Sequence, residues 1–395
     1  MRRILGNLLW EDDLAPRPTT PPRSVLETVS GLATLLRVFA RDGDHLWTPS
    51  PVDPERVLEV PGVSRPILES GPLAALPPAE ATLNWGATSP GHCRDAPRGT
   101  PWGVSGAATP ADSSQTLRGR ALQDLLWTLP MPSPAVAATV HHRAFCLQVA
   151  EQLGCALPGS QMVESLPSLD RLLAAAQAPP AWVLKAPLSA SGRNRYIERA
   201  GPRISDPRSR KAVERLFEHH GPLLFEPWMS RTADFGVSAL VAPSGLRIVG
   251  IHGQRVDIKG QFAGIDLQPV LSGAERDRLL KTAESVGTVL RREGYVGPFG
   301  IDAWRYRTES GEEILHPLGE INARMTFGLV AWAFAESVEG AVHLCFGRHL
   351  PKEEGEDIRV VPLLASGSAK GTAAWIATSP RPSSEAAQHA APLAP

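Results

Sequence analysis

Cysteine is scarce in this sequence, which has four in 395 residues, and none of them forms a Cys-x-x-Cys pair. The four are Cys93, Cys146, Cys155 and Cys345. Zinc sites and disulfide frameworks need closely spaced or numerous cysteines, so this pattern argues against both. Reduced thiols are typical of cytoplasmic proteins, and we expect the chain to be cytoplasmic.

Long apolar runs are also missing, because no stretch approaches the roughly 20 apolar residues of a membrane span. The short apolar run near the N-terminus contains Gly6 and Asn7 and ends in acidic residues 11–13, unlike a secretion signal. The formal net charge is −1, so no global field favours nucleic acid or an anionic membrane surface. We therefore expect neither a nucleic acid nor a membrane as a partner.

The two best-known nucleotide-binding motifs are absent as well. The sequence contains no Gly-x-x-x-x-Gly-Lys-Ser/Thr and no convincing Gly-x-Gly-x-x-Gly. Its length of 395 residues is enough for two or three domains, and its 38 prolines and 35 glycines indicate many loops.

Residues 1–135 predict a leading α/β domain, in which apolar strands alternate with a helix. The expected strands are 2–10, 45–51 and 80–87, and the expected helix is 24–42. Residues 86–115 are rich in Gly, Pro, Ser and Thr and predict a loop, and residues 129–139 predict a linker.

The rest of the chain alternates between amphipathic helices and apolar strands. Helical spacing is found in 140–154, 165–178, 210–221 and 273–295. The expected strands are 181–187 and 222–229, and hairpins are expected over 234–256 and 297–325. The polar stretch 252–267 predicts a flexible loop, and the Ala-, Pro- and Ser-rich residues 376–395 predict a disordered tail.

The stretch GEINARM places Glu320, Asn322 and Arg324 at alternate positions, which share one face of a strand. Carboxylate and amide oxygens suit Mg²⁺, and a neighbouring arginine suits an anion bridged by that metal. A hairpin would bring Asp302 alongside Glu320 and complete a set of three ligands. An exposed polar strand face is the alternative that the motif alone leaves open.

A second group of residues is suited to phosphate. Lys185 ends the strand WVLK, and the small-residue loop after it contains Ser191, Gly192 and Arg193. A lysine at a strand end reaches phosphate oxygens, and a glycine lets backbone N–H groups approach a phosphate closely. Taken alone, Lys185 also fits a solvent-exposed strand end.

The stretch LLFEPWM supplies a candidate base-binding segment. Residues Glu226, Pro227, Trp228 and Met229 have the form of a hinge along a nucleotide base, with Glu226 accepting from its amino group. Asp234 would accept from ribose hydroxyl groups. Each acidic residue alone is equally consistent with a surface position.

The order of these pieces resembles the ATP-grasp superfamily of carboxylate–amine ligases. The resemblance covers about residues 136–335 and rests on the Arg143 helix start, VLKAPLSASGR, FEPWM with DFGVSALV, GIDAW and GEINARM. It implies an α/β (α+β) fold in which two subdomains clasp ATP after a Rossmann-like pre-ATP-grasp domain. The implied domains are 1–135, a lid over 136–228 and a metal-binding subdomain over 229–375, followed by the tail 376–395.

The resemblance also implies the roles of individual residues. Asp302, Glu320 and Asn322 match the ligands of two Mg²⁺ ions, for which Mn²⁺ is an alternative. Lys185 matches the lysine on the α/β-phosphates, and Arg143 stands where many members have a phosphate lysine. Arg324 matches the arginine after the ligands, and it would stabilise charge on the transferred phosphoryl group or the tetrahedral carbon's oxygen. The phosphate loop has one glycine where many members have three or four.

The implied activity is ATP-dependent joining of a small carboxylate, such as an amino acid or peptide, to an amine through an acyl phosphate. A small-molecule kinase, a carboxylating enzyme and a non-catalytic ATP-binding regulator remain alternatives. Relatives in this family are often dimers, so a homodimer is one open assembly state. The sequence identifies neither the acid nor the amine.

Overall fold

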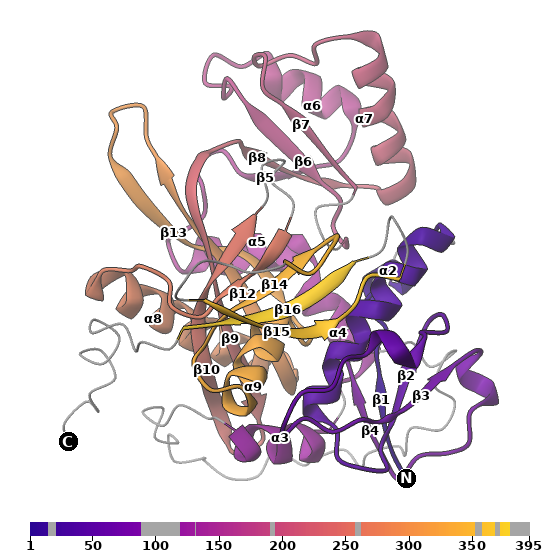
Figure 1. Ribbon diagram of the computed structural model, residues 1–395. Helices are drawn as coiled ribbons and strands as arrows, with labels where there is room; N and C mark the ends of the chain where they lie inside the picture. Colours follow the sequence, from indigo (N-terminus) through magenta and orange to yellow (C-terminus); the bar gives the residue numbers. More distant parts are fainter. Residues whose placement is uncertain are drawn as a thin grey trace.

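The computed structural model describes residues 1–14, 21–87, 119–130, 132–189, 194–256, 262–351, 358–367 and 372–379. The strands of these residues form three sheets (Figure 1). No helix in the same ranges is long and apolar enough to cross a lipid bilayer.

The N-terminal sheet is parallel, with the strand order β3-β2-β1-β4. Its strands are β1 (Arg2–Leu5), β2 (His45–Thr48), β3 (Ile67–Ser70) and β4 (Ala81–Asn84). The helices beside it are α1 (Trp10–Asp13), α2 (Arg23–Ala33), a 3₁₀ helix over Thr34–Phe39, and α3 (Gly119–Thr128). The three predicted strands are confirmed over shorter ranges, and the strand predicted over 2–10 ends at Leu5. The helix predicted over 24–42 is confirmed as α2 followed by the 3₁₀ helix, which ends at Phe39. Strand β3 was not predicted, because it is a half-exposed edge strand without clear alternation.

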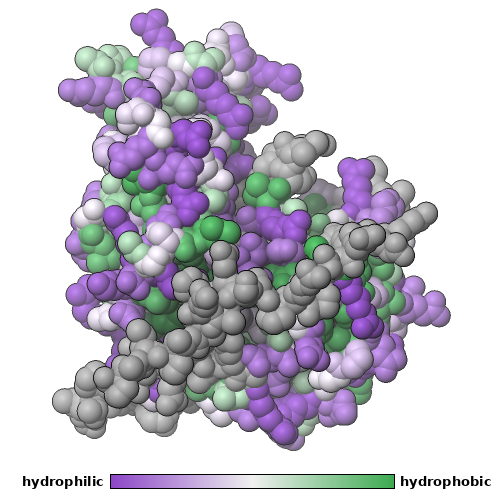
Figure 2. Space-filling model, turned by 60° about the vertical axis from the view of Figure 1, so that its left-hand side comes forward, coloured by the Kyte–Doolittle hydropathy of each residue, from purple (hydrophilic) through white to green (hydrophobic). Residues whose placement is uncertain are grey.

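A second sheet, β5-β8-β6-β7, is antiparallel and forms the lid (residues 161–227) at the top of Figure 1. Its elements are β5 (Gln161–Val163), α6 (Leu166–Leu173), β6 (Trp182–Lys185), β7 (Arg195–Glu198), α7 (Pro207–His220) and β8 (Leu223–Pro227). Trp182, Val213 and Phe225 belong to a core that is separate from the main core. The top of the lid is mostly hydrophilic (Figure 2). The lid therefore folds around its own small core.

The third and largest sheet has the order β13-β12-β9-β10-β11-β14-β16-β15. Its strands are β9 (Ser230–Ala242), β10 (Gly245–Val256), β11 (Phe262–Asp266), β12 (Gly297–Arg307), β13 (Glu313–Asn322), β14 (Ala341–Gly347), β15 (Arg359–Leu364) and β16 (Ala373–Thr378). The helices packed around it are α4 (Pro134–His141), α5 (Arg143–Gln152), α8 (Gly273–Arg292) and α9 (Phe327–Ser337). Both predicted hairpins are confirmed as β9–β10 and β12–β13.

The N-terminal sheet and the large sheet share one continuous core. Buried residues of both, such as Ile4 and Val237, belong to the same cluster. The Arg37 Nη2 group donates to the carbonyl oxygens of Leu58 at 2.7 Å and Leu363 at 3.2 Å. These contacts hold the N-terminal domain against the large sheet, while the lid stands apart (Figure 1).

Three sequence expectations need correction. Residues 134–139 of the predicted linker lie in α4, because the Ser133 hydroxyl accepts from the Val136 N–H and Pro134 suits a first helical turn. Residues 376–378 of the predicted disordered tail lie in β16, where Ile376 and Ala377 are fully buried between β14 and β15. The large sheet therefore continues past the predicted domain limit at residue 375.

The predicted loop 252–267 is mostly strand. Residues 252–256 continue β10 and residues 262–266 form β11, and the two strands pair antiparallel. Residues 257–261 lie outside the described residues. The hairpin predicted over 234–256 already includes residues 252–256, so the strand that sequence patterning missed is β11, which has five residues and contains Gly264.

Candidate active site

The polar residues of β12 and β13 lie side by side. In the antiparallel register Asp302 is opposite Glu320, and Gly300 is opposite Asn322. Residues two apart on a strand share a face, so Asn322 points to the same side as Glu320 and Asp302. The Asn322 Nδ2 group donates to Asp302 Oδ2 at 3.2 Å. We call Asp302, Glu320 and Asn322 the oxygen shelf.

Two side chains from other elements hold the oxygen shelf. Arg143, the first residue of α5, donates from Nη2 to Glu320 Oε1 at 2.9 Å. Gln254 of β10 donates from Nε2 to Asp302 Oδ1 at 2.8 Å. It reaches across β9, where Gly236 is paired with Asp302 and has no side chain to intervene. Sequence reasoning missed Gln254 because its position depends on the strand order across the sheet.

The two carboxyl groups of the oxygen shelf differ in their titration. Burial, followed by the Glu320 carboxylate, raises the pKa of Asp302 to about 6. Burial also acts to raise the pKa of Glu320, but Arg143 and Lys185 outweigh it and the pKa lies below its usual value. A divalent cation offsets the repulsion between adjacent carboxylates, and carboxylate and amide oxygens suit Mg²⁺. Asp302, Glu320 and Asn322 together offer carboxylate and amide oxygens, which are the donor types that suit Mg²⁺. The described residues contain no group of three His, Cys, Asp or Glu side chains placed to hold a metal.

Lys185 lies at the end of β6 and forms an ion pair with Glu226 of β8. In the strand register Lys185 is opposite Leu224, and Glu226 lies two residues after Leu224 on the same face. The side chains of Lys185 and Glu226 therefore project from one face of the lid sheet. The Lys185 Nζ atom also lies 5.8 Å from the centre of the Trp304 ring in β12. Lys185 therefore faces the large sheet.

The predicted base-binding segment joins the lid to β9. Pro227 has no N–H, and the Trp228 N–H donates to the Ala181 carbonyl at 2.8 Å. The Met229 carbonyl accepts from the Arg231 N–H at 3.0 Å. The Met229 N–H bonds to no other described residue, so it is the donor that this segment has available.

Asp234 lies where the lid meets the large sheet. Its Oδ1 accepts from Arg231 Nη1 at 3.0 Å, and its Cα partner in β12 is Trp304. The Arg231 guanidinium lies 3.7 Å from the centre of the Trp304 ring. Sequence reasoning missed Trp304, although its position two residues after Asp302 places it on the same face.

Arg324 does not continue the face of Glu320 and Asn322, because β13 ends at Asn322. The Arg324 N–H donates to the Asn322 carbonyl at 2.8 Å, so the chain turns there. The Arg324 Nε group contacts the Glu11 carboxylate of α1 instead. The expected shared strand face is therefore observed for Glu320 and Asn322, whereas Arg324 lies beyond the end of the strand and approaches the site from the turn that follows it.

The predicted phosphate loop lies largely outside the described residues, which exclude Ser191, Gly192 and Arg193. Its first part is held by Arg143, whose Nη1 group donates to the Ser189 hydroxyl at 2.9 Å and also contacts the Ala186 carbonyl. Arg143 thus links the start of this loop to Glu320.

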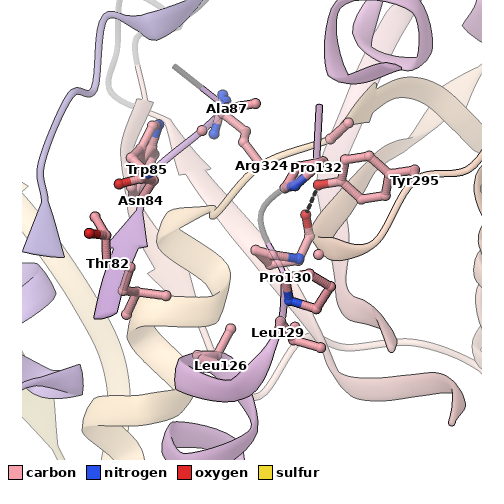
Figure 3. A pocket seen from close by; sticks show the side chains of 15 residues that line it. Thr82, Asn84, Trp85, Ala87, Leu126, Leu129, Pro130, Pro132, Tyr295 and Arg324 are labelled. Atoms are coloured by element: carbon pink, nitrogen blue, oxygen red, sulfur yellow. Dashed lines mark hydrogen bonds between the residues drawn. The ribbon is translucent and has the colours of Figure 1, made fainter. Parts of the chain in front are cut away.

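A narrow cavity adjoins Arg324 (Figure 3). Trp85, Leu126 and Tyr295 line it, and the Tyr295 hydroxyl donates to the Pro298 carbonyl at 2.5 Å. Its volume is about 20 Å³, which is room for a water molecule and not for an organic acid. The cavity is therefore a gap beside the site and not a substrate pocket in this conformation.

The sequence is similar to that of a known ligase over about half of the chain. The chain is 24% identical over 202 residues to a butirosin acyl-carrier protein–L-glutamate ligase from Niallia circulans. The match covers 49% of this chain and 45% of that protein, so the chain spans less than half of the relative's length. No protein-family model matches the chain.

Solved structures match nearly the whole chain. A Staphylococcus aureus N5-carboxyaminoimidazole synthetase, complexed with ADP, aligns with a TM-score of 0.56 and 8% identity over 98% of this chain and 95% of that one. A carboxyaminoimidazole ribonucleotide synthase from Aspergillus clavatus, complexed with ATP, gives 0.52 and 10% over 98% and 96%. At such low identity these similarities show the fold alone.

Proposed function

We propose that this chain, whose fold is that of the ATP-grasp superfamily, is an ATP-dependent carboxylate–amine ligase. The observation that carries the proposal is the oxygen shelf, with Asp302 opposite Glu320 and both on the face reached by Arg143. Lys185 faces the same sheet from the lid. The phosphates of a nucleotide bound between the lid and the large sheet would lie between the Lys185 ammonium group and the oxygen shelf.

Asp302, Glu320 and Asn322 would hold Mg²⁺, with two ions expected and Mn²⁺ as an alternative. The raised pKa of Asp302 supports this role, because burial and then the adjacent Glu320 carboxylate disfavour its charged form, and a bound cation would offset both effects. When bound, the metal would neutralise the charge of the phosphates and align them for transfer.

The remaining candidate residues would bind ATP. Lys185 and Arg143 would contact phosphate oxygens, together with the loop residues Ser191, Gly192 and Arg193. The Met229 N–H would donate to the adenine edge, with Glu226, Pro227 and Trp228 lining it. Asp234 would accept from the ribose. The domain limits 1–135, 136–228 and 229–378 are part of the same proposal.

The reaction would proceed in two transfers. A carboxylate oxygen of the acid attacks the γ-phosphorus, an O–P bond forms, the bond to the bridging oxygen breaks, and ADP leaves. The amine nitrogen then attacks the acyl carbon, phosphate leaves, and the nitrogen loses a proton. Arg324 would stabilise developing negative charge, and one such donor is typically worth about 3 kcal/mol. The lid would keep water away from the acyl phosphate.

The similarity to a ligase that acts on an acyl-carrier protein and L-glutamate supports an amino acid as one substrate. The near-complete structural match to carboxyaminoimidazole synthetases favours a second candidate, a carboxylating enzyme on the same site. Cys146, Cys155 and Cys345 form no disulfide bond among the described residues, which supports a reducing, cytoplasmic location. We also propose that the protein assembles as a homodimer.

A screen of amino acids, dipeptides and amines for ADP release tests the proposal. The blank is the Asp302→Asn/Glu320→Gln double variant, which keeps side-chain size and removes both charges. We expect one acid–amine pair to give ADP and an amide in equal amounts with the wild type only. ADP that depends on bicarbonate without amide would favour the carboxylating enzyme, and ATP binding without ADP from any pair would refute both.

A further inference from the structure

An ion pair joins the N-terminal domain to the end of β13. Glu11 lies in α1, soon after β1, and its carboxylate contacts Nε of Arg324. The Glu11 side chain is 0% exposed and that of Arg324 is 14% exposed. Removing one member of a buried ion pair is costly, because the other charge is left without a partner. The pair therefore restricts where the guanidinium lies.

The fold places this pair where open α/β sheets bind ligands. The chain runs from β1 through β2 to β3 on one side, and β4 lies on the other side of β1. The carboxyl ends of β1 and β4 thus form a topological switch point, the usual binding crevice of such sheets. Trp85 directly follows β4, and its ring centre lies 5.3 Å from the Arg324 guanidinium. Arg324 therefore reaches this crevice from the large sheet.

The guanidinium of Arg324 is fixed on two sides. Its Nε group is engaged by Glu11, and its Nη1 group donates to the Met325 carbonyl at 2.8 Å. The Met325 N–H in turn donates to the Trp85 carbonyl at 2.8 Å. The Nη2 group donates to no other described residue. Its two N–H groups are donors that the guanidinium can offer to a substrate oxygen.

A second contact ties the pair to the oxygen shelf. His141 Nδ1 accepts from the Ala323 N–H at 3.2 Å, so the proton of the neutral imidazole is on Nε2. That Nε2 lies 3.8 Å from Glu11 Oε1. Two residues later, Arg143 donates to Glu320 of the shelf. The junction of α4 and α5 thus holds both the ion pair and the shelf.

We propose that Glu11 is a positioning residue, which sets the Arg324 guanidinium so that its Nη2 group faces the reacting oxygens beside the oxygen shelf. The proposal rests on the proposed function of the site. Glu11 acts from the N-terminal domain and touches neither substrate nor metal. It makes the geometry of the reaction depend on the packing of that domain against the large sheet.

The test compares Glu11→Gln and Glu11→Asp with a matched control, Glu69→Gln. Glu69 is a half-buried carboxylate of β3, at the opposite edge of the same sheet, paired with Arg3 at 2.9 Å and His45 at 2.7 Å. Because a small misplacement of a catalytic group costs up to about 100-fold, we expect Glu11→Gln to lower kcat by about 10- to 100-fold. We expect KM for MgATP to change by less than about twofold, because Glu11 makes no contact that binds the substrate in its ground state.

Glu11→Asp retains the charge, so it should recover part of the lost kcat. Glu69→Gln should lower the denaturation midpoint and leave kcat unchanged. A purely structural role for Glu11 would instead give a lower midpoint with unchanged kcat in Glu11→Gln, and that result would overturn the proposal. Glu11→Asp also decides the matter if Glu11→Gln does not fold, since an unchanged kcat there would contradict it.

A measurement independent of turnover separates this proposal from the proposed function. The denaturation midpoints of Glu11→Gln, Arg324→Gln and the double variant are compared. We expect the double variant to lose clearly less than the sum of the two single losses, because the residues act as a pair. If the wild type forms no ADP with any substrate, the proposed function fails. Additive losses would instead show that Glu11 does not hold Arg324, and they would overturn the positioning role.

Discussion

At the scale of single residues, Asp302 and Glu320 are held together at the expense of mutual repulsion. The strand register places the two residues opposite each other. Gln254 donates to the Asp302 carboxylate, and Arg143 donates to the Glu320 carboxylate. Burial and the Glu320 charge raise the pKa of Asp302 to about 6. Such an arrangement is expected where a site serves a bound cation more than the stability of the fold.

The first prediction concerns Asp302→Asn. It removes one negative charge and keeps the shape, so we expect ADP formation to fall by at least about 100-fold through loss of a metal ligand. The free energy of unfolding should change by less than about 1 kcal/mol, because the lost hydrogen bonds are offset by relief of repulsion. Urea denaturation and an ADP assay check both parts. A large loss of stability with residual activity would contradict the role.

The second prediction concerns pH and two buried histidines. Burial lowers the pKa of both His252 and His316 to about 4, from 6.5 in the unfolded chain. Between pH 6.5 and about pH 4 the two histidines are protonated in the unfolded chain and neutral in the folded protein. The free energy of unfolding therefore falls as the pH falls through this range. The expected loss is about 1.4 kcal/mol per pH unit for each histidine.

Denaturation at neutral pH and at about pH 5 measures this loss of stability. His252→Gln should reduce the slope, because one titrating group is removed. His219→Gln is the control, since His219 is exposed on α7. An equal slope in the wild type and in His252→Gln would refute the assignment.

Strand alternation predicted the oxygen shelf at this scale, because Glu320 and Asn322 are two residues apart and Asp302 lies in the partner strand of one hairpin. It could not predict Glu11 or Gln254. Glu11 meets Arg324 across 313 residues, and Gln254 meets Asp302 across 48. Such contacts depend on how sheets and domains pack, which periodicity does not encode.

At the scale of elements, β12 and β13 depend on one glycine. A Cβ atom at Gly319 would lie 1.6 Å from the Trp304 ring, so the indole occupies the space of the missing side chain. Trp304 is 3% exposed and contacts His316, with ring centres 4.4 Å apart. The glycine thus positions the aromatic surface that faces Lys185.

The third prediction is that Gly319→Ala destabilises the protein by about 1–3 kcal/mol, because the Trp304 ring must move within a packed interior. The matched control is Gly273→Ala in the first turn of α8, where an added Cβ meets nothing within 4 Å. Chemical denaturation measures both variants. Equal stability of the two would show that Trp304 is not confined as described.

Elements with strong local signals were predicted well, among them α8 with its Ser272–Glu275 capping box and the hairpin turned near Gly311. Strands β5, β7 and β16 were missed and lack such signals. Strands β5 and β7 have three and four residues, and β16 follows a stretch whose composition resembles a tail. For these strands, pairing with neighbours decides the structure more than local preference does.

At the scale of the whole molecule, the lid has its own core, while the N-terminal domain and the large sheet share another. The predicted ATP-grasp fold is confirmed by the match to solved structures over 98% of the chain. In this arrangement Lys185 on the lid faces Trp304 on the large sheet, so a ligand between them would contact both bodies.

The fourth prediction is that MgADP raises the melting temperature. A ligand that binds only the folded protein stabilises it by about 2.7 kcal/mol at 100 times its dissociation constant. Chelation of the metal with EDTA should reduce this effect, because the shelf then repels the phosphates. Differential scanning calorimetry checks both results. An equal rise with and without metal would contradict the role of the shelf.

The most direct measurement is a crystal structure with Mn²⁺ and a non-hydrolysable ATP analogue, examined by anomalous scattering at the manganese edge. The account predicts manganese peaks within bonding distance of Asp302, Glu320 and Asn322, with the triphosphate between them and Lys185. A nucleotide bound elsewhere, or an oxygen shelf without metal beside a bound nucleotide, would contradict it.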